Sequence, residues 1–333
     1  MQGKTSAMRR ASASVRYGMT AIACALAMTA AALAQTFPAH TVRIIVPFPA
    51  GGTADVMPRV VADWLSRRWG QPVVIENKTG AAGNIGAEAA YKAEPDGYTL
   101  LSAPPPPLVI NQNLYPILPF DPARFVPISV MGIVPNALVV NPKKIAAKTV
   151  ADFIAYAKAN PGKVAAATQG NGTTSHLTSE LFQMMAGVKF VQVPYRGSAP
   201  ALQGLLAGDV DIMFDNLGVS LALVKSGQLR LIAVGTEKRM TSLPDVPTIA
   251  ETLPGFASSA WFAVVAPPST PAPIVDKISA DIAAAIKDPG VRKRLADLSA
   301  EPVGGTPAAT AAFMRAEVER WNKVIKVANV KLK

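Results

Sequence analysis

The feature that most constrains the fold is a short β-branched run that ends at two prolines, crosses a glycine turn and leads into a helical pattern. Residues 42–46 are apolar and β-branched except for Arg43, which is typical of a buried strand. Pro47 and Pro49 have no amide hydrogen, so they are expected to end the strand ladder. The Ala-Gly-Gly turn at 50–52 permits close backbone approach, and a helix is predicted from 55 to 69.

This strand–turn–helix unit is a candidate anion site. Thr53 or Asp55 is suited to cap the helix, and the first amide N–H groups of the helix would converge on one point. Those donors and the helix dipole attract an anion. Glycine turns also join strands to helices in α/β folds without binding anything. The unit therefore predicts either a ligand site or a plain connection.

The first residues have the pattern of a secretory signal. A basic stretch precedes the apolar run 19–33, and Ala32-Leu33-Ala34 fits the small-x-small cleavage rule with Gln35 as the new N-terminus. We expect a signal peptide at 1–34, removed on export to the periplasm, with an uncleaved anchor as the alternative. Cys24 lies in the apolar run and is interpreted as part of the signal.

The expected mature chain has 299 residues, from 333 less 34, and contains no cysteine. It therefore has no disulfide and no thiol nucleophile, and a chain of this length can bury a core without such links. Lys and Arg fall from 33 to 29 against 22 acidic residues, giving a net charge of +7. The cations are scattered and aromatic residues are sparse, so the composition does not predict nucleic-acid binding.

Strand–glycine–helix units recur along the chain. The second follows strand 72–77, and two more follow strands 164–168 and 190–193. The glycines at 80–86 only loosely fit a dinucleotide fingerprint, because no acidic residue stands at the required distance. Further strands are predicted at 98–102, 128–131, 137–140, 209–214, 229–234 and 259–266, and helices at 149–159, 199–207, 219–225, 271–287, 291–298 and 306–326.

These alternations predict an α/β fold with mainly parallel pairing. The strand predictions at 128–131 and 137–140 are separated by Gly132 and Pro135, where the chain is expected to cross into a second lobe. Strand 259–266 is expected to return it. The predicted lobes are residues 35–136 with 260–333, and residues 137–259.

Seven motifs along the chain resemble the Bug/TctC solute-binding proteins of tripartite tricarboxylate transporters. They are Pro-Ala-Gly-Gly-x-x-Asp, Gly-Ala-x-Gly-x-Ile-Gly-Ala, Pro-Asp-Gly-Tyr-Thr-Leu, Gly-x-Gly-Thr-x-x-His, Val-Pro-Tyr-Arg-Gly, Leu-Pro-Asp-Val-Pro-Thr and the Trp-Phe pair at 261–262. The resemblance covers essentially the whole expected mature chain, and the motifs keep the family's order.

Membership of this family implies a two-lobed, type II periplasmic binding protein with a mainly parallel sheet in each lobe and two crossover segments. It implies that loops of both lobes hold a carboxylate through backbone amides, hydroxyls and waters, and that the ligand passes to a membrane permease. Carried over residue by residue, the implied ligand-binding residues are Pro49, Ala50, Gly51, Gly52, Thr53, Asp55, Asn84, Ser102, Gly170, Gly172, Thr173, Ser175, His176, Tyr195, Arg196, Gly197, Asp215 and Asn216.

Several of these residues also have plain structural interpretations. His176 could cap or satisfy local backbone, Asp215 could cap a helix or accept from a ligand amine, and Arg196 could be solvated. Trp261 is interpreted as hinge packing. The run 104–107 is all proline where the family more often has polar residues, so this wall of the cleft is expected to be apolar and a small polar amino-acid ligand is disfavoured.

The sequence thus predicts a monomeric carboxylate-binding protein without cofactor, metal or catalysis. Its partners would be a di-, tri- or aromatic carboxylate and the subunits of a membrane permease. A ligand-sensing accessory to a signalling receptor is the alternative. An exported hydrolase is disfavoured, because no Gly-x-Ser-x-Gly elbow is present and only His40 and His176 could serve as a base.

Overall fold

The run that opens the chain's first unit forms a strand, β1 (Val42–Val46), which pairs in parallel with β2 (Val73–Asn77) on one side and β3 (Thr99–Ala103) on the other. The computed structural model describes residues 37–328 and 330, so the predicted signal peptide lies outside the described residues. Among the described residues, ten strands form one continuous sheet in the order β2-β1-β3-β9-β4-β7-β5-β6, with β10 and β8 paired to β4.

The second lobe repeats the parallel pattern of the first. β5 (Val164–Thr168) pairs in parallel with β6 (Phe190–Pro194) and with β7 (Ile212–Asn216). The predicted parallel pairing is therefore found in β2-β1-β3 and in β7-β5-β6. The strands between these groups pair antiparallel, so each lobe has a mixed sheet.

Two strands cross between the lobes, β4 (Val126–Val140) and β9 (Ser259–Ala266). The prediction of two strands separated by Gly132 and Pro135 was wrong, because β4 is one strand of 15 residues. Register shifts near Gly132 absorb the irregularity, and the strand changes partner beside Pro135. Up to Pro135 it pairs with β9, and from Asn136 it pairs with β7. The predicted lobe boundary at 136/137 lies beside this change and stays a prediction.

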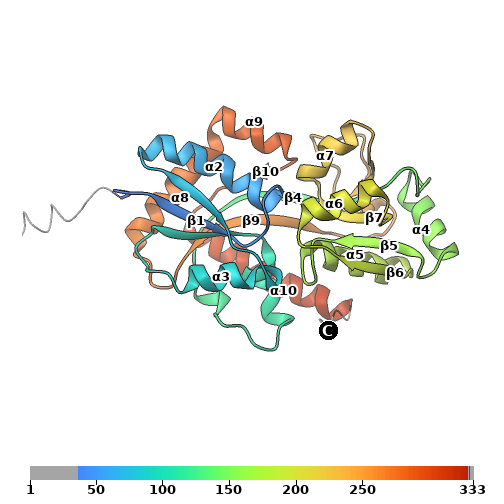
Figure 1. Ribbon diagram of the computed structural model, residues 1–333, viewed down its shortest axis with the longest axis horizontal. Helices are drawn as coiled ribbons and strands as arrows, with labels where there is room; N and C mark the ends of the chain where they lie inside the picture. The colour runs from blue at the N-terminus through green and yellow to red at the C-terminus, as the bar shows by residue number, and fades with distance from the viewer. Residues whose placement is uncertain (1–36, 329, 331–333) are drawn as a thin grey trace, which may run out of the picture. The chain divides into compact units, whose positions relative to one another are not determined.

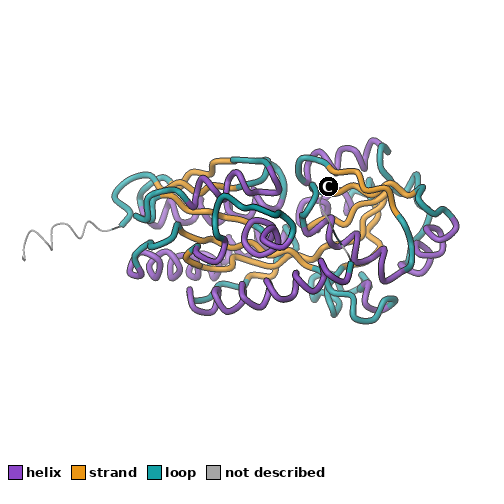
Figure 2. Tube along the Cα trace, turned by 90° about the horizontal axis from the view of Figure 1, so that it is seen from below, coloured by secondary structure: helices purple, strands orange, loops and turns teal. Residues whose placement is uncertain are grey.

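Helices cover both faces of the sheet in each lobe (Figures 1 and 2). In the first lobe α2, α8 and α9 pack on one another, and α3 and α10 lie on the opposite face. In the second lobe α4 and α5 share one apolar cluster, and α6 and α7 border another. Their bounds are α2 (Thr53–Trp69), α3 (Asn84–Tyr91), α4 (Val150–Ala159), α5 (Thr174–Ala186), α6 (Ser198–Ala207), α7 (Leu217–Lys225), α8 (Ala272–Lys287), α9 (Pro289–Asp297) and α10 (Pro307–Val327).

Shorter elements complete the chain. β8 (Arg230–Val234) and β10 (Glu301–Pro302) pair with β4, and the proline run leads into one buried π-helical turn at Pro106–Ile110. Within the described residues, no helix combines the length and apolar character needed to cross a bilayer.

The C-terminal helix α10 links the cores of the two lobes. Val324 packs against both the first-lobe cluster and the cluster shared by α4 and α5. On the same helix Glu317 is 6% exposed, and its carboxylate accepts hydrogen bonds from the indole N–H groups of Trp261 at 2.7 Å and Trp321 at 3.0 Å. Trp261 lies on the crossing strand β9 and is 1% exposed, so it is a packed core residue, and its role in a hinge stays a prediction.

Candidate functional site

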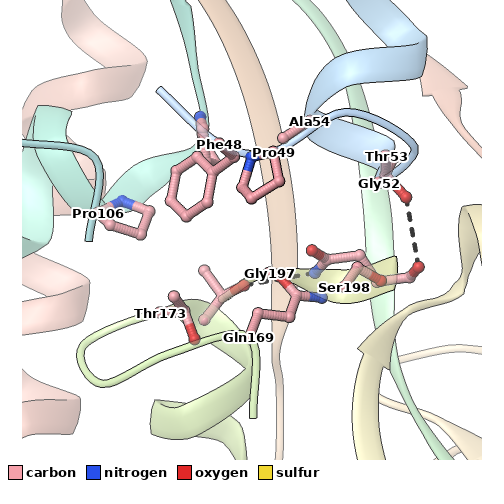
Figure 3. Close-up of a pocket in the computed structure, with 13 residues that line it drawn as sticks. Phe48, Pro49, Gly52, Thr53, Ala54, Pro106, Gln169, Thr173, Gly197 and Ser198 are labelled. Carbon is pink, nitrogen blue, oxygen red and sulfur yellow. Dashed lines mark hydrogen bonds between the residues drawn. The ribbon is translucent and has the colours of Figure 1, made fainter. Parts of the chain in front are cut away.

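A small cavity lies where the first-lobe turn meets the second lobe. Its volume is about 20 Å³, which is room for roughly one water-sized group. Phe48, Pro49 and Pro106 face Gln169 and Thr173 across it (Figure 3). Its lining carries no charged side chain and consists of Phe48, Pro49, Gly52, Thr53, Ala54, Pro104, Pro106, Gln169, Thr173, Thr174, Gly197, Ser198 and Asn216. We call it the inner cavity.

Four helices begin at the inner cavity. Its lining includes Thr53, Thr174 and Ser198, the first residues of α2, α5 and α6, and Asn216, which immediately precedes α7. Among the described residues, no side chain caps α2, α6 or α7. Each helix start presents amide N–H groups and about half a positive charge. The inner cavity is therefore suited to an anion although no cation lines it.

Glycines let the two lobes approach closely around this cavity. Gly197 has a φ of +111°, and a Cβ there would lie 3.1 Å from Pro49 Cδ. A Cβ at Gly218 would lie 2.8 Å from Thr53 Oγ1, which donates to the carbonyl oxygen of Asn216 at 3.4 Å. A side chain at either position would force the neighbouring residue of the other lobe to shift, so these two glycines permit the close contact between the lobes.

A larger cavity of about 440 Å³ adjoins the inner one, and Phe48, Pro49, Gln169 and Gly197 line both. We call it the outer cavity. Its remaining lining is Pro47, Thr79, Gly80, Ala81, Ala82, Gly83, Gly170, Asn171, Tyr195 and Arg196.

One wall of the outer cavity is a strained turn before α3. Gly80, Ala81, Ala82 and Gly83 all have positive φ, which is unfavourable for alanine. Asn111 supports this turn, because its amide donates to the carbonyl oxygen of Ala82 at 3.1 Å and to Asn84 Oδ1 at 2.6 Å. Asn84 therefore stabilises the turn indirectly, through its hydrogen bond with Asn111.

Asp55 braces the first-lobe turn from inside the protein. It accepts hydrogen bonds from Gly51 N at 3.0 Å, from Arg59 at 3.0 Å and from Asn77 at 2.8 Å. Burial opposes its ionisation, but the three hydrogen bonds outweigh this and lower the pKa of Asp55 below its ordinary value. Neither Thr53 nor Asp55 caps α2, because the residue before the helix is Gly52 and no side chain bonds there.

The second-lobe turn is held by its own side chains. Thr173 Oγ1 donates to the carbonyl oxygen of Gly170 at 2.7 Å and accepts from His176 N at 3.4 Å, so it caps α5. His176 Nδ1 accepts from Gly172 N at 3.2 Å. Burial lowers the pKa of His176, with Glu180 opposing, so the ring acts as a neutral acceptor. These groups shape the turn, and Thr173 occupies one of the first amide N–H groups of α5.

Asp215 lies one layer behind the inner cavity and is fully buried. Its Oδ1 accepts from Ser198 Oγ at 2.8 Å and from Gln169 Nε2 at 3.0 Å, and both donors line the cavity. Its Oδ2 has no hydrogen-bond partner among the described residues. Burial raises the pKa of Asp215 to about 6, although hydrogen bonds from its neighbours oppose the shift.

This raised pKa predicts a pH-dependent difference between the protein and its Asp215→Asn variant. The protonated carboxyl stabilises the fold below pH 3.8, and this contribution is lost as pH rises to about 6. Relative to Asp215→Asn, the unfolding free energy should therefore fall by roughly 2 kcal/mol between pH 4 and 6, reach a total loss of about 3 kcal/mol near pH 7 and stay constant above that. Urea unfolding of both proteins across this range measures the difference, and a flat difference from pH 4 to 6 would contradict the assignment.

A polar network connects the inner cavity to both crossing strands. Asn216 Nδ2 donates to Asn136 Oδ1 on β4 at 2.6 Å, and Asn136 Nδ2 donates to Ser258 Oγ, just before β9, at 2.9 Å. Ser258 Oγ lies 2.5 Å from Thr178 Oγ1 on α5. The helix starts at the cavity are thus tied to the two segments about which the lobes would move.

The structure brings the two predicted turns together. Pro49, Gly52, Thr53, Thr173, Gly197 and Asn216 line the inner cavity, and Gly170, Tyr195 and Arg196 line the outer one. The other predicted site residues line neither cavity: Ala50, Gly51, Asp55, Asn84, Ser102, Gly172, Ser175, His176 and Asp215. Their contact with a ligand stays a prediction.

Sequence reasoning missed several lining residues that stand next to predicted ones. Phe48 lies between the two prolines of the first turn, Gln169 precedes Gly170, and Ser198 follows Gly197. Taking the residue on either side of each predicted turn residue would have included Phe48, Gln169, Thr174 and Ser198. Within residues 37–328 and 330, no group of three His, Cys, Asp or Glu side chains is arranged to hold a metal ion.

Two α/β lobes joined by crossing strands, with an anion-suited cavity between them, define the class of periplasmic solute-binding proteins. A family model described as TctC, the tripartite tricarboxylate transporter family receptor, matches residues 57–330, and the chain belongs to this family. It is 41% identical over 303 residues to the protein BugT of Bordetella pertussis, covering 90% of this chain and 93% of BugT.

Solved structures agree with this assignment. The R. palustris protein Rpa4515 with adipate has a TM-score of 0.86 and 39% identity, covering 89% of this chain and 99% of its own. MatC from Rhodopseudomonas palustris with bound malate has a TM-score of 0.82 and 32% identity, covering 87% of this chain and all of its own. The chain is therefore a solute-binding protein of a transporter-associated family.

Proposed function

We propose that this protein captures a small carboxylate between its lobes, with one carboxylate end in the inner cavity. The observation that carries the proposal is the convergence of four helix starts, one from the first lobe and three from the second, on a cavity without a charged side chain. Amide N–H donors at helix starts can stabilise an anion where no charged side chain is present. The adipate and malate in the similar structures support a carboxylate ligand.

The geometry supports capture by closure. The first-lobe donors lie at α2 and the second-lobe donors at α5, α6 and α7, so a ligand that contacts both sets favours the closed arrangement. The turn at 49–55 would then act with the turn at 170–176, as the family resemblance implies. A hinge movement about the crossing strands would open the site.

In this proposal the protein is exported by a signal peptide cleaved near Ala34–Gln35, acts as a monomer and delivers its ligand to the membrane permease of a tripartite tricarboxylate transporter. Family membership supports the permease, and the basic and apolar N-terminal pattern supports export. The proposed lobes are residues 35–136 with 260–333, and residues 137–259.

We also infer that the bound ligand is released unchanged. Ser198, the serine that lines the inner cavity, donates to Asp215 and not to a histidine. His176, the candidate base, already accepts from Gly172 N through its Nδ1. Neither pair forms the nucleophile–base contact that a hydrolase uses.

A thermal-shift screen tests the ligand class. A ligand at a hundredfold excess over its Kd that binds only the folded state stabilises it by about 2.7 kcal/mol, which raises the melting temperature by several degrees. We expect di-, tri- or aromatic carboxylates to do this, while their amides and neutral sugars do not. A panel in which no carboxylate raises the melting temperature would contradict the proposal.

A further inference from the structure

Arg196 is the only charged residue among those that line the outer cavity. It lies on the turn between β6 and α6, directly before Gly197, and its side chain is exposed. No ion pair or side-chain hydrogen bond joins it to any other described residue. Its guanidinium is therefore available to a guest in the cavity, and its fork of donors matches a carboxylate.

The sizes of the two cavities suggest how a ligand would be divided between them. The inner cavity, at about 20 Å³, has room for roughly one water-sized group, such as an oxygen of a terminal carboxylate. The outer cavity, at about 440 Å³, falls in the range of small-molecule pockets. A ligand anchored in the inner cavity must therefore extend into the outer one.

The boundary between the two cavities is narrow and apolar on its first-lobe side. Phe48 and Pro49 line both cavities there, and Gly197 approaches Pro49 so closely that a Cβ would lie 3.1 Å from its ring. A thin apolar segment, such as a chain of methylene groups, suits this passage better than a hydrated or branched one. The first-lobe wall beyond it, Thr79–Gly83, carries no charge.

We propose that Arg196 forms a second anion subsite that binds the distal carboxylate of an extended aliphatic dicarboxylate. The near carboxylate lies at the helix starts of the inner cavity, the methylene chain lies beside Phe48 and Pro49, and the far carboxylate reaches Arg196. This inference rests on the proposed function, because it takes the inner cavity as the first carboxylate site. It makes Arg196 the residue that selects diacids over monoacids of equal length.

Calorimetry with adipate and hexanoate tests the subsite, because these acids share a six-carbon chain and differ in the distal carboxylate. We expect the protein to bind adipate at least tenfold more tightly than hexanoate. Arg196→Gln should lose about tenfold in adipate affinity while its hexanoate affinity stays within twofold. Arg196→Lys, which keeps the charge without the planar fork, should retain part of the adipate preference.

The matched control is Arg124→Gln, which removes an exposed arginine that lines neither cavity. Its affinities for both acids should equal those of the unaltered protein. The distal subsite is wrong if Arg196→Gln lowers the affinity for both acids equally or for neither. It is also wrong if the unaltered protein binds the two acids equally. In each of these cases the inner carboxylate site is unaffected. If neither acid binds the unaltered protein, both the distal subsite at Arg196 and the proposed binding of an aliphatic carboxylate in the inner cavity are wrong.

Discussion

Replacing Gly52 by arginine is expected to lower ligand affinity by at least a hundredfold while the protein still folds. Gly52 has a φ of −89° and a ψ of 169°, so a side chain there introduces no backbone strain. A Cβ would lie 3.3 Å from Ser198 Cβ on the opposite lobe, and the inner cavity beside it holds only about 20 Å³. The arginine side chain must therefore occupy the cavity or keep the lobes apart, and either removes the two-sided contact with the ligand.

Calorimetry with a carboxylate found by the thermal-shift screen measures this loss. The control is Ala151→Arg, which adds the same side chain at an exposed position of α4 away from both cavities. It should keep full affinity, and both variants should unfold cooperatively near the melting temperature of the ligand-free protein. Undiminished affinity in Gly52→Arg would place the ligand elsewhere.

The second large effect is expected at the link between α10 and the crossing strand. Glu317→Ala should reduce the unfolding free energy by about 3–5 kcal/mol, because it leaves two buried indole N–H groups unpaired, each costing about 1–3 kcal/mol. Trp261 is 1% exposed and Trp321 is 2% exposed, so water does not reach these donors without local opening. The lost carboxylate also frees Arg320, which donates to its Oε1 at 3.0 Å.

Urea unfolding compares this variant with two others. Glu317→Gln keeps an acceptor oxygen for the indoles and should cost about 1 kcal/mol. Glu319→Ala, two residues along the same helix and exposed, should change stability by less than about 0.5 kcal/mol. If Glu317→Ala and Glu319→Ala have the same midpoint, the buried carboxylate does not hold the two tryptophans.

Where local signals agree, sequence predicted the structure to within a few residues. The strand at 42–46, the turn at 50–52 and the helix ending at Trp69 were all confirmed, because β-branched residues, prolines and glycines restrict the backbone whatever surrounds them. The same signals misled at β4, where Gly132 and Pro135 suggested a break. There the strand continues because β9, β10 and β7 flank it and register shifts absorb the irregular residues.

The candidate site shows a similar division. The family resemblance implied that a loop of each lobe acts on one ligand, and residues of the turns at 49–55 and 170–176 do line one cavity. That Asp55 and Thr173 hold their own turns, and that Asp215 stands behind Ser198 and Gln169, could not be read from spacing. Their hydrogen-bond partners depend on the directions of the side chains in the folded chain. Such hydrogen bonds produce no pattern in the sequence from which they could be predicted.

The order of residues along this chain is enough to specify its family, its α/β alternation and the glycine turns that bear the anion site, since each depends on neighbours within a few positions. Which helix starts meet, how little room lies between them and where Arg196 stands relative to that space follow from packing between residues far apart in the sequence. Those contacts form only when the two lobes are folded and brought together, and so only the tertiary structure decides them.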